Sequence, residues 1–160
     1  MIPYGKQNID NDDIKSVIDV MNSDFLTQGP MTPLFEKELK SICKAKFAVA
    51  TINATSALHL ACLSIGISKG DIVWTSTISF VASANCVRYC GGEIDFVDID
   101  PKTYNMSIDS LKAKLIIAKK EGRLPKALIP VHLSGQSCDM KKIHDLSKIY
   151  GFKIIEDASH

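Results

Sequence analysis

Residues 71–97 read DIVWTSTISFVASANCVRYCGGEIDFV, and this stretch decides the fold class. The apolar run at residues 71–75 predicts a strand, residues 80–89 predict a helix, and residues 93–97 predict a second strand. Two strands joined through a helix pair side by side in a parallel sheet more readily than as a hairpin. This stretch therefore indicates one unit of an α/β sheet.

The same alternation of strand and helix extends on both sides of this unit. Further strands are predicted at residues 47–52, 127–131 and 152–156, and further helices at residues 53–65, 107–121 and 139–150. Ser107 and Asp139 are the expected N-caps of the last two helices, because their side-chain oxygens can accept from free backbone N–H groups. The pattern predicts a largely parallel sheet with helices on its faces.

The first part of the chain has a different, purely helical pattern. Asp10 or Asn11 can cap a helix whose apolar residues fall on one face, and Thr32 and Pro33 can open a second amphipathic helix. The apolar positions of these two helices are Ile14, Val17, Ile18, Met21, Leu34, Phe35, Leu39 and Ile42. We therefore expect an N-terminal helical segment at residues 1–46, followed by the α/β part at residues 47–160.

Composition and charge limit the classes of function. The 160 residues are 46% hydrophobic and 23% charged, and the net charge of +1 gives no electrostatic reason to expect nucleic acid or an anionic membrane as a partner. The first six residues do not resemble a signal peptide, and no apolar run is long enough to span a bilayer. The cytoplasm is therefore the expected location. The five cysteines favour free thiols, although Cys86 and Cys90 are spaced to share a metal; no metal is expected.

Ligands of parallel α/β sheets bind at the carboxyl ends of the strands, so four segments are candidates for a site: residues 53–56, 75–80, 132–136 and 157–160. The first could present free backbone N–H groups to a phosphate at a helix N-terminus, or could be a plain cap formed by Thr55 or Ser56. The sequence contains neither a dinucleotide glycine fingerprint nor a Walker sequence, so the usual nucleotide cradles are disfavoured.

The other three segments also allow two interpretations each. Phe80 could stack on a flat cofactor ring, or could begin its helix and pack inward. Asp157 could pair with a protonated heterocyclic nitrogen, or could cap a following helix. For His132, a core histidine bonded to a backbone group is favoured over a ligand contact. Gln136 could bond a ligand or its own turn. The role of His160 is open.

Taken together and in order, six segments resemble the DegT/DnrJ/EryC1/StrS family of pyridoxal-phosphate sugar aminotransferases over essentially all 160 residues. The segments are LTQGP at 26–30, NATSAL at 53–58, SFVASAN at 79–85, VDID at 97–100, PVHLSGQ at 130–136 and EDASH at 156–160. Residues 76–85 and 124–140 are most similar to the branch that aminates UDP-4-keto-6-deoxy-N-acetyl-β-L-altrosamine on the route to pseudaminic acid. The implied fold is part of the large domain of the type I aspartate aminotransferase fold.

The resemblance implies a role for five residues at a pyridoxal 5′-phosphate site. Ala54 and Thr55 match the positions that hold the cofactor phosphate, and Phe80 matches the aromatic residue that stacks on the pyridine ring. Asp157 matches the carboxylate paired with the pyridinium nitrogen. His160 matches a position near the phenolic oxygen of the cofactor.

The resemblance also implies the partners of the reaction. Thr27 matches a loop close to the sugar site. The implied substrates are a nucleotide-linked keto-sugar and glutamate. The whole enzyme is expected to be a homodimer. In the family, a lysine a few tens of residues beyond the segment at 156–160 forms the resting Schiff base, and no lysine of this chain matches it. We therefore expect this chain alone to lack transaminase turnover and to be poorly soluble.

Two alternatives to an aminotransferase portion remain open at this point. The first is a non-catalytic module that holds the cofactor or pairs with a full-length homologue. The second is a sugar dehydratase of the same family, in which a histidine replaces the lysine. The residue at the position of the missing lysine would distinguish the dehydratase from the aminotransferase.

Overall fold

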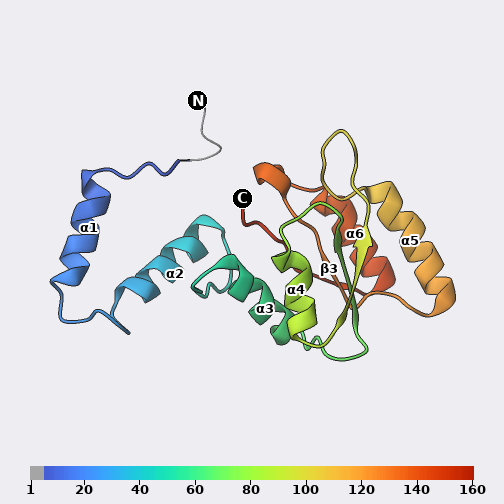
Figure 1. Ribbon diagram of the computed structural model, residues 1–160, viewed down its shortest axis with the longest axis horizontal. Coiled ribbons are helices and arrows are strands. Elements are labelled where there is room, and N and C mark those ends of the chain that lie inside the picture. The colour runs from blue at the N-terminus through green and yellow to red at the C-terminus, as the bar shows by residue number, and fades with distance from the viewer. Residues whose placement is uncertain (1–5) are drawn as a thin grey trace. The chain divides into compact units, whose positions relative to one another are not determined.

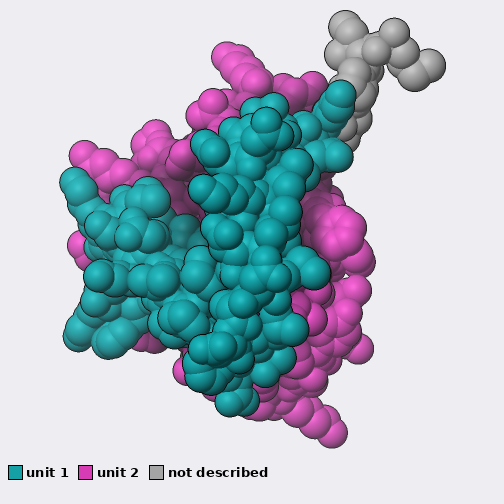
Figure 2. All heavy atoms as spheres, turned by 90° about the vertical axis from the view of Figure 1, so that its left-hand side faces the viewer, with its two compact units in different colours: residues 1–50 teal, residues 51–160 magenta. Residues whose placement is uncertain are grey.

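The computed structural model describes residues 6–160, and the chain falls into two compact units, of which the first ends at Ala50 and the second runs from Thr51 to His160. Figure 2 colours the two units. The prediction that the N-terminus does not resemble a signal peptide rests mostly on residues 1–5, which lie outside the described residues. Among the described helices, none combines the length and the apolar character that a bilayer crossing requires.

The first unit contains the two amphipathic helices that the sequence predicts, α1 (Asn11–Met21) and α2 (Met31–Ile42). The Asp10 carboxylate accepts from the backbone N–H groups of Asp12 and Asp13, and the Asp13 carboxylate accepts from the Asp10 N–H in return. This reciprocal capping box fixes the start of α1. Neither helix contains a buried residue, so the apolar faces of both remain exposed.

The second unit contains a four-stranded parallel sheet in the order β2-β1-β3-β4. Figure 1 labels β3 and the four longer helices of this unit. The strands are β1 (Ile72–Ser76), β2 (Glu93–Val97), β3 (Ala127–Ile129) and β4 (Lys153–Ile154). The helices are α3 (Ala54–Ser64), α4 (Ala82–Tyr89), α5 (Ile108–Glu121) and α6 (Met140–Tyr150), with a short 3₁₀ turn, η1 (Leu133–Gly135), after β3. The predicted α/β class is therefore confirmed.

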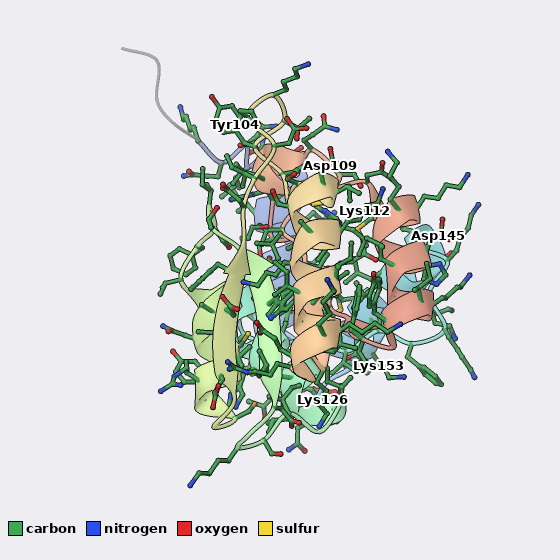
Figure 3. All side chains as sticks on the ribbon, turned by 90° about the vertical axis from the view of Figure 1, so that its right-hand side faces the viewer. Tyr104, Asp109, Lys112, Lys126, Asp145 and Lys153 are labelled. Carbon is green, nitrogen blue, oxygen red and sulfur yellow. The ribbon has the colours of Figure 1, made fainter. Side chains whose placement is uncertain are left out.

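The sheet separates two hydrophobic cores because successive residues of a strand point to opposite faces. On β1, Val73 packs with α3 and α4, whereas Trp74 packs with α5 and α6. Leu128 of β3 lies on the face of Trp74, and its neighbours Ala127 and Ile129 lie on the face of Val73. Figure 3 shows α5 and α6 side by side over one of these faces.

Two helix starts on this face follow the local sequence signals. The Ser107 hydroxyl accepts from the N–H of Ser110, and the Asp139 carboxylate accepts from the N–H of Lys142, as expected of N-caps. Gly122 ends α5 with φ 67°, in the left-handed region that glycine adopts without steric cost. These caps fix where each crossover helix begins and ends.

One predicted strand is wrong. Residues 47–52 are irregular, and Phe47, Val49 and Ile52 are 75%, 77% and 91% exposed. A strand exists only where another strand accepts and donates its backbone hydrogen bonds. Within the described residues, the two edges of the sheet are formed by β2 and β4, and residues 47–52 pair with neither.

The order of the strands creates a crevice between β1 and β3. The chain leaves β1 through α4 toward β2, and leaves β3 through α6 in the opposite direction toward β4. The helices of these two connections cover opposite faces of the sheet, so the carboxyl ends of β1 and β3 mark a topological switch point. A ligand site is expected at this place.

Candidate cofactor site

A pocket of about 240 Å³ opens at this crevice, and it brings all five predicted cofactor residues together. Ala54 and Thr55 come from the start of α3, Phe80 from the loop after β1, and Asp157 and His160 from the segment after β4. No lysine lines the pocket. These residues are distant in sequence, and the parallel topology delivers them to one edge of the sheet.

The N-terminus of α3 forms the polar end of the pocket. Asn53, rather than Thr55 or Ser56, is the N-cap, and its side-chain oxygen accepts from the Ser56 N–H over 2.8 Å. Within the described residues, the N–H groups of Ala54 and Thr55 and the Thr55 hydroxyl bond to no protein acceptor. Free N–H groups at the positive end of a helix dipole favour an anion such as phosphate.

Phe80 provides an aromatic wall. It precedes α4, whose N-cap is Val81, and its side chain is 71% exposed while lining the pocket. The alternative that Phe80 packs into the core is therefore wrong. An exposed aromatic ring beside a cavity can stack against a flat heterocycle.

Asp157 lies at the base of the pocket and is only 5% exposed. Its backbone is held beside β3, because the Asp157 N–H donates to the carbonyl of Pro130 and the His132 N–H donates to the carbonyl of Asp157. Its carboxylate accepts from the hydroxyls of Ser83 and Ser159, and no cation of the described residues forms an ion pair with it. A buried carboxylate without a cationic partner is costly, so a cationic ligand would be stabilised here.

His160 lies at the rim of the pocket with a defined ring orientation. Its Nδ1 accepts from the Ser134 backbone N–H over 3.2 Å, which leaves Nε2 as the donor of the neutral ring. His132 lies outside the pocket and is held similarly, since its Nδ1 accepts from the Cys138 N–H and its Nε2 lies 3.0 Å from Glu156. The predicted bond from His132 to a backbone group is therefore confirmed, although the ring is half-buried and also faces the exposed Glu156.

The remaining candidates lie elsewhere. The carbonyl of Gln136 accepts from the Asn105 side chain, and Gln136 does not line the pocket. Thr27 is an exposed residue of the loop between α1 and α2 in the first unit, and its role at a sugar site stays a prediction. The sequence predicts no role for Ser83, whose partner Asp157 lies 74 residues away, or for Ser159, which lies two residues from Asp157 within the candidate segment 157–160.

Comparison with known protein families identifies the family of this chain. Residues 7–160 match the profile of the DegT/DnrJ/EryC1/StrS aminotransferase family. The chain belongs to this family. Family members depend on pyridoxal phosphate, and solved neighbours include PLP and PMP forms.

Several curated relatives match almost the whole chain. The spore coat polysaccharide biosynthesis protein SpsC of Bacillus subtilis is 38% identical over 99% of this chain and 39% of its own length. The GDP-perosamine synthase of Caulobacter vibrioides is 37% identical over 99% of this chain and 41% of its own length. The chain therefore spans about two fifths of the length of the curated relatives it matches.

Solved structures of the family share the fold. The Helicobacter pylori aminotransferase PseC, involved in the biosynthesis of pseudaminic acid, superposes with a TM-score of 0.90 at 32% identity, covering 99% of this chain and 41% of PseC. A family aminotransferase from Brucella abortus superposes with a TM-score of 0.85 at 36% identity, covering 91% of this chain and 39% of its own. These likenesses agree with the parallel sheet and flanking helices described above.

The residues at the pocket fit pyridoxal phosphate chemically. The free N–H groups at the start of α3 suit its phosphate, the exposed ring of Phe80 suits its flat pyridine, and the buried Asp157 carboxylate lacks a cation that a protonated ring nitrogen would supply. The anion site, the aromatic wall and the buried carboxylate thus match the phosphate, the ring face and the ring nitrogen of this cofactor.

Proposed function

We propose that this chain provides the cofactor-binding part of a pyridoxal-phosphate aminotransferase acting on a nucleotide-linked keto-sugar. The single observation that carries the proposal is the buried Asp157 carboxylate, which has hydroxyl partners but no cation among the described residues, at the base of a pocket with a free helix N-terminus. When bound, the cofactor supplies an electron sink for the carbon that loses its proton in amino transfer.

Each residue of the pocket has a proposed task toward the cofactor. The N–H groups of Ala54 and Thr55, with the Thr55 hydroxyl, bind the phosphate. Phe80 stacks on one face of the ring and restricts its tilt. Asp157 keeps the ring nitrogen protonated, and the Nε2–H of His160 donates to the phenolic oxygen.

We further propose a substrate of the UDP-4-keto-6-deoxy-N-acetyl-altrosamine type, with glutamate as the amino donor, as in pseudaminic acid biosynthesis. The support for this sugar is the similarity to PseC of Helicobacter pylori. Thr27 is proposed to contact the sugar, and the whole enzyme is proposed to act as a cytoplasmic homodimer. A product assay that compares this keto-sugar with a GDP-linked keto-sugar tests the choice of substrate, since one curated relative is a GDP-perosamine synthase.

A second candidate is a module that holds the cofactor without turning it over. It is favoured by one observation, that no lysine lines the pocket. Amino transfer needs an amine that forms the resting Schiff base and shuttles the proton. We therefore propose that this chain binds the cofactor but does not transaminate by itself.

Titration of the purified chain with pyridoxal phosphate tests the cofactor site. Wild type is expected to bind saturably, and Asp157→Ala is expected to weaken binding at least about tenfold, since it removes the only proposed partner of a buried charge. Ser147→Ala, which removes an exposed hydroxyl bonded to the His144 carbonyl of its own helix, is the matched control. Equal affinity of Asp157→Ala and wild type would contradict the proposal.

The same preparation tests turnover. Incubation with pyridoxal phosphate, glutamate and the UDP-linked keto-sugar is expected to give no aminated sugar. Detection of that product would exclude the second candidate and would require an amine from elsewhere in the protein.

A further inference from the structure

Ser83 does not line the pocket itself, but it contacts Asp157, which does. It belongs to α4, its side chain is fully buried, and its hydroxyl oxygen is 2.6 Å from Oδ2 of Asp157, which is 74 residues away in sequence. On its other side, the Ser83 hydroxyl lies 2.5 Å from the hydroxyl of Ser79. Ser79 lines the pocket and immediately precedes Phe80.

The proton positions in this chain of three groups follow from the acceptor. An ionised carboxylate only accepts hydrogen bonds, so the Ser83 proton points to Asp157. The Ser83 oxygen is then free to accept. The Ser79 hydroxyl also lies 3.1 Å from the Phe80 carbonyl, but Ser83 is the nearer acceptor, so Ser79 donates to Ser83. The bonds run in one direction, from Ser79 to Ser83 and from Ser83 to Asp157.

The donors to Asp157 are unevenly divided between its two oxygens. Oδ1 accepts from both the hydroxyl and the backbone N–H of Ser159. Oδ2 accepts from Ser83 alone. Since each carboxylate oxygen accepts about two hydrogen bonds, Oδ2 is the oxygen with unused capacity.

We infer that Ser79 and Ser83 are positioning residues, which hold Asp157 so that Oδ2 presents its remaining lone pair to a protonated ring nitrogen in the pocket. This inference rests on the proposed function. The same two hydrogen bonds tie the loop that carries Phe80 to the segment that carries Asp157. These bonds therefore hold Phe80, which is proposed to stack on the ring, in a fixed position relative to Asp157, which is proposed to bind the ring nitrogen.

A purely structural role for Ser83 predicts a different result. If the hydroxyl only packs and bonds inside the protein, its removal alters the pocket for every ligand alike. If it acts through Asp157 on the ring nitrogen, its removal affects only ligands that contain this nitrogen. A pair of ligands that differ at that single atom separates the two roles.

The experiment measures the dissociation constants of 4′-deoxypyridoxine 5′-phosphate and its 1-deaza analogue by calorimetry on the purified protein. Neither ligand has an aldehyde, so no Schiff base contributes. Ser83→Ala is expected to weaken the nitrogen-containing ligand on the order of tenfold and to change the deaza analogue by less than about twofold. Ser64→Ala, whose hydroxyl bonds only the Ala61 carbonyl of its own helix, is the matched control.

The outcomes are distinguishable. Equal weakening of both ligands, or no weakening of either, by Ser83→Ala overturns the inference while the cofactor site stands. Absence of binding by wild type overturns the proposed function and the inference together. If Ser83→Ala unfolds, Ser79→Ala replaces it, with an expected selective loss of about threefold because its hydroxyl reaches Asp157 only through Ser83.

Discussion

The backbone N–H of Ser134 donates to Nδ1 of His160 over 3.2 Å. Ser134 has φ 54° and ψ 29°, a left-handed conformation that is costly for a residue other than glycine. The turn is held by the buried side chain of Asn105, which donates to the Gln136 carbonyl over 2.8 Å and accepts from the Leu133 N–H over 3.1 Å. A residue outside every motif thus fixes the ring orientation of the histidine at the pocket rim.

Asn105→Ala is expected to lower the free energy of unfolding by about 1 kcal/mol. It leaves the Gln136 carbonyl without its donor, whereas the Leu133 N–H keeps the Val131 carbonyl as an acceptor at 3.0 Å. Urea denaturation followed by circular dichroism measures the change. Gln136→Ala is the control, since only the backbone carbonyl of Gln136 takes part in the contact. Equal stability of Asn105→Ala and wild type would show that the turn holds its shape without this side chain.

Ala54→Pro isolates one backbone N–H at the proposed phosphate site. Ala54 is the first residue of α3, where proline is tolerated, and Asn53 before it is already extended at φ −166° and ψ 168°. The variant is expected to keep the helix, to bind pyridoxal phosphate about threefold to tenfold more weakly and to bind pyridoxal unchanged. Fluorescence titration with both ligands measures this.

The control for that variant is Ala54→Gly, which also changes the side chain but keeps the N–H. It is expected to bind both ligands nearly as wild type does. If Ala54→Pro binds pyridoxal phosphate with wild-type affinity, this N–H does not contact the phosphate.

A pH-dependent contribution to stability is expected at the opposite end of the sheet. Figure 3 places Lys126 at the end away from Tyr104, and its Nζ lies 2.8 Å from Oδ2 of Asp71. The hydrogen bond from Lys126 holds the pKa of the Asp71 carboxyl below its usual value of about 3.9. A lowered pKa in the folded state stabilises the fold above the unfolded pKa, and this contribution disappears as the pH falls through the folded pKa.

Lys126→Met is therefore expected to lose up to about 1 kcal/mol near neutral pH, with a smaller deficit below about pH 4. The difference in unfolding free energy between pH 3 and pH 7 measures it. Lys142→Met is the control, since its partner Asp139 forms a more exposed pair. A deficit that does not depend on pH would mean that lost packing of the Lys126 stem, rather than its charge, is responsible.

The chain is expected to self-associate through apolar residues that are exposed because the sheet does not bury them. Phe47 and Val49 are 75% and 77% exposed in an irregular segment without a strand partner among the described residues. Val49→Lys is expected to lower the fraction of oligomer seen in analytical ultracentrifugation. Ile149→Lys, which places the same charge at an exposed site on α6, should have less effect.

The elements with local signals could be predicted from the sequence. The four strands of the sheet, the caps at Ser107 and Asp139 and the two amphipathic helices of the first unit depend on periodicity and on residues within one turn. The five cofactor residues could be named because the parallel topology and the family resemblance both point to the carboxyl edge of the sheet. The structure brings these five to one pocket.

The remainder depends on contacts between distant residues. Residues 47–52 have the composition of a strand, yet no strand of the described chain pairs with them. The cap of α3 is Asn53, whose side chain reaches the Ser56 N–H, so the predicted cap by Thr55 or Ser56 is wrong. Ser83 and Asn105 could not be found, because their partners lie 74 and 31 residues away.

Asp157 is proposed to hold the ring nitrogen of pyridoxal phosphate in its protonated form. Nitrogen-15 NMR of the protein with pyridoxal phosphate labelled at the ring nitrogen measures this protonation state. The ring nitrogen is expected to be protonated near neutral pH in wild type and unprotonated in Asp157→Asn. A bound cofactor whose ring nitrogen has the same protonation state in both proteins would contradict it.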